Sequence, residues 1–323
     1  MVGLFCITLH TKQRPAVTAH ILRKLLYFPV KSTVAFCQMN LILKKRQMIK
    51  WVLLLLFFNS VLHSIAGNAD TIQYPKLNKQ YLKSYWYDSR DFILSPAGWG
   101  KRQWIELGIV AGAGTIAYTQ DESIQKYFAG HRSETADKFS KYIFEPFGNG
   151  KITAAIIGGL YVGGRIAKDK RLAGTSLTAA KAFVVSSVCT QVIKQITHRH
   201  RPFQDVIPDH SNLDGPFSSS SYTSFPSGHS DAAFSLATVF AMEYSNTIWV
   251  PVLAYTLAAG TAVSRVYDNK HWASDVIVGS ALGFVTGRFM WKQSRKSNNK
   301  LTLFPAVGQN TAMLTFIIRF PEP

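Results

Sequence analysis

Residues 226–244 read PSGHSDAAFSLATVFAMEY, a Pro-Ser-Gly-His turn followed at once by an apolar run. The run is rich in alanine and serine and has the length of a short helix, so we expect a helix from Ser230 to Tyr244. A serine and a glycine just before a helix are typical of an N-cap and a turn, and the N–H groups of such a helix end can bind an anion. The stretch therefore predicts a helix whose N-terminus can carry a polar site.

Five more apolar stretches of similar length flank this one. They are rich in Ala, Gly, Ser and Val, small residues that let helices approach closely in membranes and in tight soluble bundles alike. We expect each of them to form a helix, at residues 104–118, 152–166, 177–193, 248–263 and 276–291. The expected fold class is all-α, a bundle of six core helices. Alternating apolar residues from Leu301 to Phe320 predict a short C-terminal β-hairpin in addition.

Two further polar segments lie beside these helices. Residues 194–202, KQITHRHRP, offer two cations seven positions apart, and residues 264–275, SRVYDNKHWASD, place a carboxylate four positions after a histidine. If His271 opens the helix that follows, His271 and Asp275 lie on one face of it. The carboxylate would then hold one ring nitrogen protonated and aim the other, as a nucleophile, at a phosphorus atom.

Phosphoryl transfer also needs fixed positive charge and a proton donor. Its transition state spreads negative charge over the equatorial oxygens, so cations and N–H donors stabilise it. Lys194, Arg201 and Arg265 supply three cations, and arginine forks can each hold two oxygens. His229, beside the Ser-Gly turn, is placed to protonate a leaving group and then to activate water.

In this order the three segments resemble the signature of the type 2 phosphatidic acid phosphatase (PAP2) and vanadium haloperoxidase superfamily. That signature is Lys, six residues, Arg-Pro; then Pro-Ser-Gly-His; then Ser-Arg, five residues, His, three residues, Asp, and all eleven defined positions are filled within residues 104–291. The resemblance implies that His271 is the nucleophile, His229 the acid and Asp275 the residue that orients His271. It further implies phosphate binding by Lys194, Arg201, Ser227, Gly228 and Arg265.

The expected function is a metal-independent phosphatase without a cofactor, acting through a phosphohistidine. The resemblance favours a lipid phosphate or diphosphate, with a small soluble phosphoester as the alternative, as in periplasmic acid phosphatases. A vanadium-dependent haloperoxidase would use the same pocket, and a phosphate-binding scaffold would leave its two histidines idle. Two nearby groups are not expected to bind a metal. The basic stretch His198-Arg199-His200 looks exposed, so we expect its side chains to be solvated or to face the substrate. Asp205, Asp209 and Asp214 lack the spacing of a calcium loop and are expected to be polar loop residues.

The N-terminal region predicts export. Nine of the Lys and Arg residues lie within the first fifty positions and no acidic residue precedes Asp70, so half of the formal charge of +18 is terminal. The remaining positive charge is consistent with an envelope protein that binds a phosphorylated substrate, and we expect no nucleic-acid partner. A basic start at residues 48–50 precedes an apolar stretch, 51–66, whose end is compatible with cleavage after Ala66. An uncleaved anchor is the alternative.

The expected domain layout follows from these features. Residues 1–66 would be an extension plus a signal peptide or anchor, 67–103 a lead-in arm, 104–291 the phosphatase domain, and 292–323 a basic linker and hairpin. The apolar runs are at the lower limit of the 17 to 25 residues that cross a bilayer, and the mean hydropathy is only +0.05. We therefore expect a membrane-associated or integral bundle in the cell envelope, with its site facing the periplasm.

Overall fold

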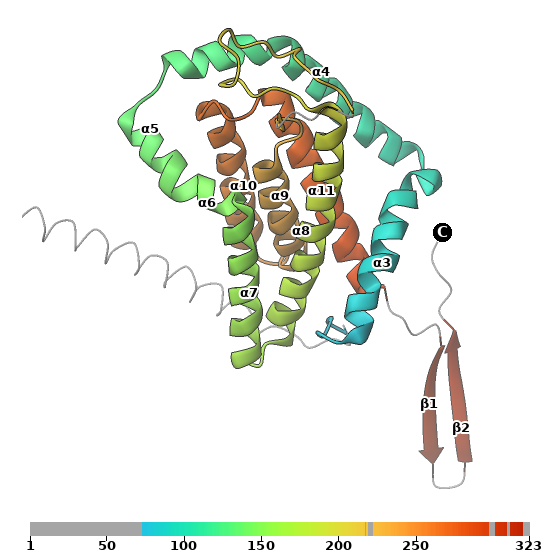
Figure 1. Ribbon diagram of the computed structural model, residues 1–323. Helices are drawn as coiled ribbons and strands as arrows, with labels where there is room; N and C mark the ends of the chain where they lie inside the picture. Colours follow the sequence, from blue (N-terminus) through green and yellow to red (C-terminus); the bar gives the residue numbers. More distant parts are fainter. Residues whose placement is uncertain (1–72, 217, 219–221, 297–300, 309–310, 319–323) are drawn as a thin grey trace, which may run out of the picture. The chain divides into compact units, whose positions relative to one another are not determined.

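The computed structural model describes residues 73–216, 218, 222–296, 301–308 and 311–318, and its larger part is helical (Figure 1). This confirms the predicted helical class. The helices that contain the six predicted stretches are α4 (Lys101–Gly130), α7 (Gly150–Ile166), α8 (Lys170–Thr197), α9 (Gly228–Glu243), α10 (Trp249–Tyr267) and α11 (Ala273–Arg295). The predicted export signal lies outside the described residues.

Each apolar stretch expected to be helical lies within one of these helices, apart from single residues at its ends. The helices are mostly longer than the stretches, because polar residues continue them. The described chain also contains elements that were not expected: α3 (Lys79–Leu94), a 3₁₀ turn η1 (Ser95–Gly98), α5 (Glu134–Phe139), a π-helical turn η2 (Ser140–Phe144) and α6 (Glu145–Gly148).

Helix α3 occupies the segment expected to be a lead-in arm. It begins where the Asn78 side chain accepts the N–H of Tyr81, an N-cap bond of 2.8 Å. The Tyr81 hydroxyl donates to the Leu177 carbonyl of α8 at 2.8 Å, and Lys181 of α8 pairs with Asp88 at 2.5 Å. The charge inside the apolar stretch 177–193 is therefore paired, and it ties α3 to the bundle.

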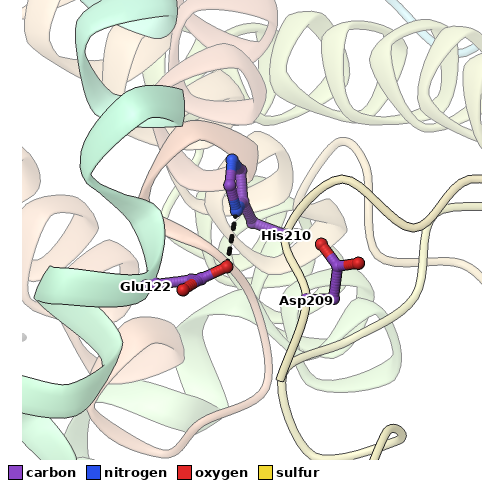
Figure 2. A group of neighbouring side chains, drawn as sticks. All are labelled: Glu122, Asp209 and His210. Carbon is purple, nitrogen blue, oxygen red and sulfur yellow. Dashed lines mark hydrogen bonds and ion pairs between the residues drawn. The ribbon is translucent and has the colours of Figure 1, made fainter. Parts of the chain in front are cut away.

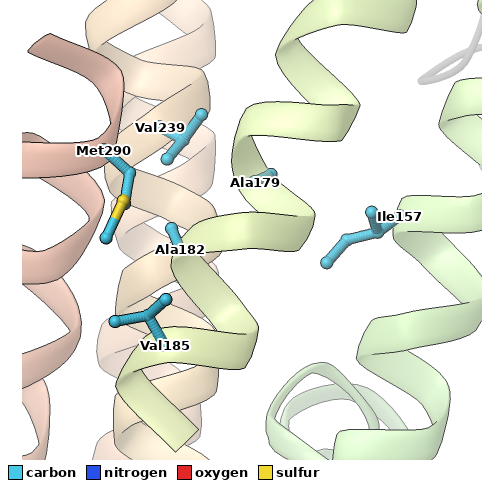
Figure 3. Packing of buried hydrophobic residues seen from close by; sticks show 6 residues of the cluster. All are labelled: Ile157, Ala179, Ala182, Val185, Val239 and Met290. Carbon is cyan, nitrogen blue, oxygen red and sulfur yellow. The ribbon is translucent and has the colours of Figure 1, made fainter. Parts of the chain in front are cut away.

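Helix α9 packs against α8, α10 and α11 (Figure 1). Glycines allow its close contact with α11: a Cβ at Gly279 would stand 2.4 Å from the Ser227 carbonyl oxygen, and one at Gly283 would stand 2.2 Å from that of Asp231. Figure 3 shows the side chains of the main apolar cluster, which are Ile157, Ala179, Ala182, Val185, Val239 and Met290. This packing brings the N-terminal ends of α9 and α11 together, and the Ser227 N–H donates to the Asp275 carbonyl at 3.0 Å.

The loop after α8 folds back on itself. Helix α8 ends at Thr197, and its C-cap residue His198 has a left-handed φ of 42° that turns the chain. Arg199 then forms an isolated β-bridge with Leu213, and the Asp214 N–H donates to the His198 carbonyl at 3.3 Å. The three residues 198–200 are consequently covered by residues that follow them in the same loop.

Two strands follow the helical part. Strand β1 (Leu301–Gly308) pairs antiparallel with β2 (Thr311–Ile318), with Leu301 opposite Ile318 and Gly308 opposite Thr311. Within the described part of the chain, one helix, α8, is long and apolar enough to cross a membrane, and most of that segment is buried.

Candidate active site

The predicted site residues lie where four helices begin or end. Lys194 is in the last turn of α8 and Arg265 in the last turn of α10. Ser227 is the N-cap of α9, and Asp275 is in the first turn of α11. Because consecutive helices of the bundle alternate in direction, these ends meet on one side (Figure 1). His271 lies in the turn between α10 and α11.

His271 and Asp275 meet, but not as two residues of one helix. Helix α11 begins at Ala273, after the N-cap Trp272, so the expectation that His271 opens the helix is wrong. The Asp275 carboxylate occupies the third helical position and accepts the Trp272 N–H at 3.0 Å. Its Oδ2 atom lies 3.6 Å from Nδ1 of His271. The capping bond fixes the carboxylate next to the imidazole.

Asp275 is fully buried and carries further partners. The Ser224 hydroxyl donates to Oδ2 at 2.5 Å, and the Arg199 guanidinium contacts Oδ1 at 2.6 Å. Burial alone would raise the pKa of Asp275, but the contact with His271 and the charge of Arg199 hold it below its usual value. Asp275 is thus an anion that can orient the Nδ1–H of His271 and leave Nε2 free of this pairing.

The basic stretch read as exposed is buried in the structure. His198, Arg199 and His200 are each less than 8% exposed. His200 lies between two loop carboxylates, with Nδ1 2.8 Å from Asp205 and Nε2 3.2 Å from Asp214. The expectation of solvated side chains is wrong because the loop supplies carboxylates and carbonyl groups that satisfy these polar groups without water.

The three expected cations are held by short-range contacts. Lys194 donates to the backbone carbonyl groups of Thr223 and Ser224. Among the described residues, the Arg201 guanidinium makes one weak contact, with the Thr223 hydroxyl at 3.4 Å. Because these partners are neutral, both cations keep charge available for an anion.

Arg265 differs because it has anionic partners. It pairs with Asp268 at 2.9 Å and lies 3.5 Å from Glu145, at the start of α6. These contacts hold the guanidinium in place at the end of α10. They also neutralise part of its charge.

Ser227 and Gly228 form the beginning of α9. The Ser227 side chain accepts the N–H of Ser230 at 3.4 Å, so it acts as an N-cap. Gly228 faces Lys194: a Cβ at this glycine would lie 3.9 Å from Cε of the lysine. The start of α9 and the end of α8 therefore border the same space.

Both predicted catalytic histidines are uncharged at neutral pH. Burial is the main cause that lowers the pKa of His271 to about 4, and the contact with Asp275 opposes this effect. Burial, and then the charge of Arg265, lower the pKa of His229 to about 3. The His229 Nε2 atom is buried and has no hydrogen-bond partner among the described residues. A neutral His271 suits a nucleophile, whereas a neutral His229 must gain a proton before it can act as an acid.

The predictions from sequence did not include the residues outside the signature that support Asp275. Asp121 of α4 is fully buried and accepts the Ser274 N–H at 2.9 Å and the Arg199 guanidinium at 2.9 Å. No local pattern marks Asp121, because its partners lie far along the chain. Ser224 stands in a serine-rich loop, where one serine cannot be told from its neighbours by sequence.

One group of possible metal ligands lies beside these residues. Among the described His, Cys, Asp and Glu residues, Glu122, Asp209 and His210 have ligand atoms that all lie within 4.8 Å of one another. Figure 2 shows the imidazole of His210 bonded to Glu122 through Nδ1, at 3.0 Å. Asp209 already accepts the N–H and hydroxyl of Ser211. The hydrogen bond between His210 and Glu122 and the contacts of Asp209 with Ser211 account for this group, which contains none of the predicted site residues.

Comparison with known proteins gives a family for the C-terminal half of the helical region. Residues 175–299 match the PAP2 superfamily and include all three polar segments. The chain is 49% identical over 65 residues to lipid A 1-phosphatase of Porphyromonas gingivalis, a match that covers 20% of this chain and 15% of that protein.

Two further relatives match over longer stretches. Decaprenylphosphoryl-5-phosphoribose phosphatase of Mycobacterium tuberculosis is 34% identical over 124 residues, which cover 38% of this chain and 63% of the relative. Undecaprenyl-diphosphatase of Sulfolobus acidocaldarius is 32% identical over 114 residues, which cover 35% and 52%. The chain thus spans less than two thirds of the length of each of these relatives. The match places residues 175–299 of this chain in the PAP2 superfamily.

Proposed function

We propose that the protein is a phosphatase that hydrolyses a lipid-linked phosphomonoester or diphosphate through a phosphohistidine at His271, without a metal or other cofactor. The observation that carries this proposal is the pairing of His271 with a buried, fully bonded Asp275 beside three cations. Such an arrangement supports nucleophilic attack by Nε2, because Nδ1 is held by the carboxylate.

The reaction would proceed in two steps. Nε2 of His271 attacks phosphorus and the bond to the leaving oxygen breaks, while protonated His229 gives its proton to that oxygen. Neutral His229 then takes a proton from water, the resulting hydroxide attacks phosphorus, and the phosphorus–nitrogen bond breaks to restore His271. Lys194, Arg201, Arg265 and the start of α9 would stabilise the equatorial oxygens, with Ser227 and Gly228 contributing at that helix end.

His229 would gain its proton only when substrate is present. The free site holds several positive groups around an uncharged imidazole. A bound phosphate dianion reverses the local charge and so favours the imidazolium. His229 would therefore be protonated, and able to act as an acid, only in the complex with substrate.

Two observations support a lipid-linked substrate over a soluble one. The relatives are named for lipid A, a decaprenyl-linked phosphate and undecaprenyl diphosphate. In addition, Val206 and Ile207 are exposed in the loop that follows Arg201, where they could contact hydrocarbon. A soluble phosphoester remains the alternative substrate.

The experiment is a release assay on purified protein that pairs lipid phosphates and diphosphates in micelles with soluble phosphoesters. Halide oxidation is measured beside it, with and without vanadate. Phosphate release from lipids that is lost in His271→Ala supports the proposal. Release from soluble esters alone favours the alternative substrate, halide oxidation with vanadate favours a haloperoxidase, and binding without turnover favours a scaffold.

We further propose that the phosphatase domain spans residues 104–291 and acts in the cell envelope, with its site facing the periplasm. A signal or anchor within residues 1–66 would direct it there, and 67–103 and 292–323 would be appendages. Reporter fusions after residues 70, 170, 210 and 295 test this. Export of all four supports a membrane-associated periplasmic bundle, whereas alternation between compartments would show an integral protein.

A further inference from the structure

We propose that Arg199 is a positioning residue of the nucleophile: it fixes Asp275 and, through Asp275, sets the orientation and basicity of His271. Arg199 lies outside the eleven positions of the family signature. The inference rests on the proposed function, because it assigns a role within the same site.

All five N–H donors of Arg199 are used within the protein. One terminal nitrogen donates to Asp275 Oδ1 at 2.6 Å and to the Ser274 hydroxyl at 2.8 Å. The other donates to Asp121 at 2.9 Å and to the His210 carbonyl at 2.7 Å, and Nε donates to the same carbonyl at 3.0 Å. A guanidinium has five such hydrogens, so none remains for a phosphate. Arg199 therefore differs in kind from Arg201.

Asp121 holds Arg199 through the terminal nitrogen that does not contact Asp275. Its carboxylate also accepts the backbone N–H and the hydroxyl of Ser274, at 2.9 and 2.5 Å. Since Ser274 directly precedes Asp275 in the first turn of α11, Asp121 ties α4 to the helix end that carries the catalytic carboxylate. Arg199 and both carboxylates are at most 2% exposed, so water does not screen these contacts.

The loop enters this network through a backbone group. The His210 carbonyl accepts two of the five Arg199 hydrogens, while the His210 ring bonds Glu122 of α4. The loop is thereby attached both to the guanidinium and to α4. Arg199 joins three separate segments at the point where Asp275 is oriented.

The charge of Arg199 limits how strongly Asp275 attracts a proton. With Arg199 removed, the carboxylate would stabilise the His271 imidazolium more, so the pKa of His271 would rise. Attack requires the neutral imidazole. As the pH falls, the variant without Arg199 would therefore lose activity at a higher pH than the wild type does. The other charged or titratable groups facing His271 stay in place; they are Lys194 of α8, Arg201 of the loop, His229 of α9 and Arg265 of α10.

The test compares Arg199→Met and Arg199→Lys with a matched control. Arg171→Met removes a partly buried arginine, which pairs with Glu243 at 3.0 Å and lies away from the predicted site residues. Rates on a soluble aryl phosphate are measured from pH 4 to 8, together with vanadate inhibition and thermal stability. Arg199→Met should lower kcat about 100-fold, as expected for a misplaced reacting group, with KM and vanadate inhibition within about threefold. Its acid limb should move up by about one pH unit, with a smaller shift in Arg199→Lys.

Other outcomes would overturn the proposal. If Arg199→Met loses only thermal stability, like Arg171→Met, with an unchanged pH profile, Arg199 is a structural tie. If KM and vanadate inhibition weaken while kcat holds, Arg199 contacts substrate instead.

Two measurements keep the test decisive if Arg199→Met does not fold or if no substrate is turned over. Asp121→Asn should show a weaker kcat loss, because Arg199 is held less firmly, and its acid limb should move to lower pH, because the charge of Arg199 is then less compensated. An NMR titration of the His271 imidazole should give a higher pKa in Arg199→Gln, which lacks the charge, than in the wild type, and equal values would refute the proposal. Because the titration needs no turnover, a failed phosphatase assay would count against the proposed function alone.

Discussion

Vanadate binding to this protein at pH 6 should be accompanied by the uptake of about one proton by His229. With a pKa of about 3, only about one His229 side chain in a thousand is protonated at pH 6 in the free protein. To protonate it fully, the bound anion must raise the pKa by more than three units, or about 4 kcal/mol. A single negative charge about 4 Å from the ring supplies about 4 kcal/mol at an effective dielectric constant of about 20, and the dianionic substrate supplies more.

Titration calorimetry measures this uptake. Vanadate is injected in two buffers at pH 6 that differ in ionisation enthalpy, and the slope of the observed enthalpy against the buffer enthalpy gives the number of protons. His229→Gln is the control, since protons taken up by vanadate itself or by His271 cancel in the difference. A difference of between about half a proton and one proton is expected. Equal uptake in both proteins would refute the reasoning, because His229 would then stay neutral in the complex.

Three further results are expected. Ser224→Ala removes a buried hydrogen bond to Asp275, and since bonds to charged groups are worth about 1.5–3 kcal/mol, kcat should fall by roughly 10- to 100-fold with KM nearly constant; an unchanged kcat would contradict this. Activity should survive a chelator, and vanadate should inhibit as a transition-state mimic; loss in chelator that zinc or magnesium restores would refute the metal-free mechanism. Replacing Val206 and Ile207 together by Asp should raise KM for lipid phosphates in vesicles but not for a soluble ester, and equal effects would argue against contact with lipid.

The polar segments could be predicted to converge because each stands at the end of an apolar run. Helices of similar length that alternate in direction bring such ends together, so Lys194, Arg265 and Asp275 meet for reasons visible in the sequence. The exact start of α11 could not be predicted from the sequence. Asp275 caps the N–H of Trp272, which leaves His271 outside the helix, and a spacing of four residues fits either arrangement.

The support of Asp275 could not be predicted, because it depends on contacts between distant residues. Asp121 lies within α4, 153 positions before Ser274, and nothing near it in sequence distinguishes it from another helical carboxylate. The role of Arg199 likewise depends on residues that are distant in sequence. In isolation a His-Arg-His stretch is typical of a solvated surface. Arg199 is buried here because α4, α11 and the folded-back loop together accept hydrogen bonds from all of its N–H groups.

Trapping the phosphoenzyme tests the central claim most directly. His229→Ala, which lacks the base for the second step, is mixed with an aryl phosphate carrying radiolabelled phosphorus; its acidic leaving group needs no proton donor. The reaction is stopped in alkali and the labelled residue is identified by mass spectrometry. The account predicts a label on His271 that is stable in alkali and lost in acid, and that is absent from the double variant His229→Ala/His271→Ala. A label on another residue, or turnover without any label on His271, would contradict it.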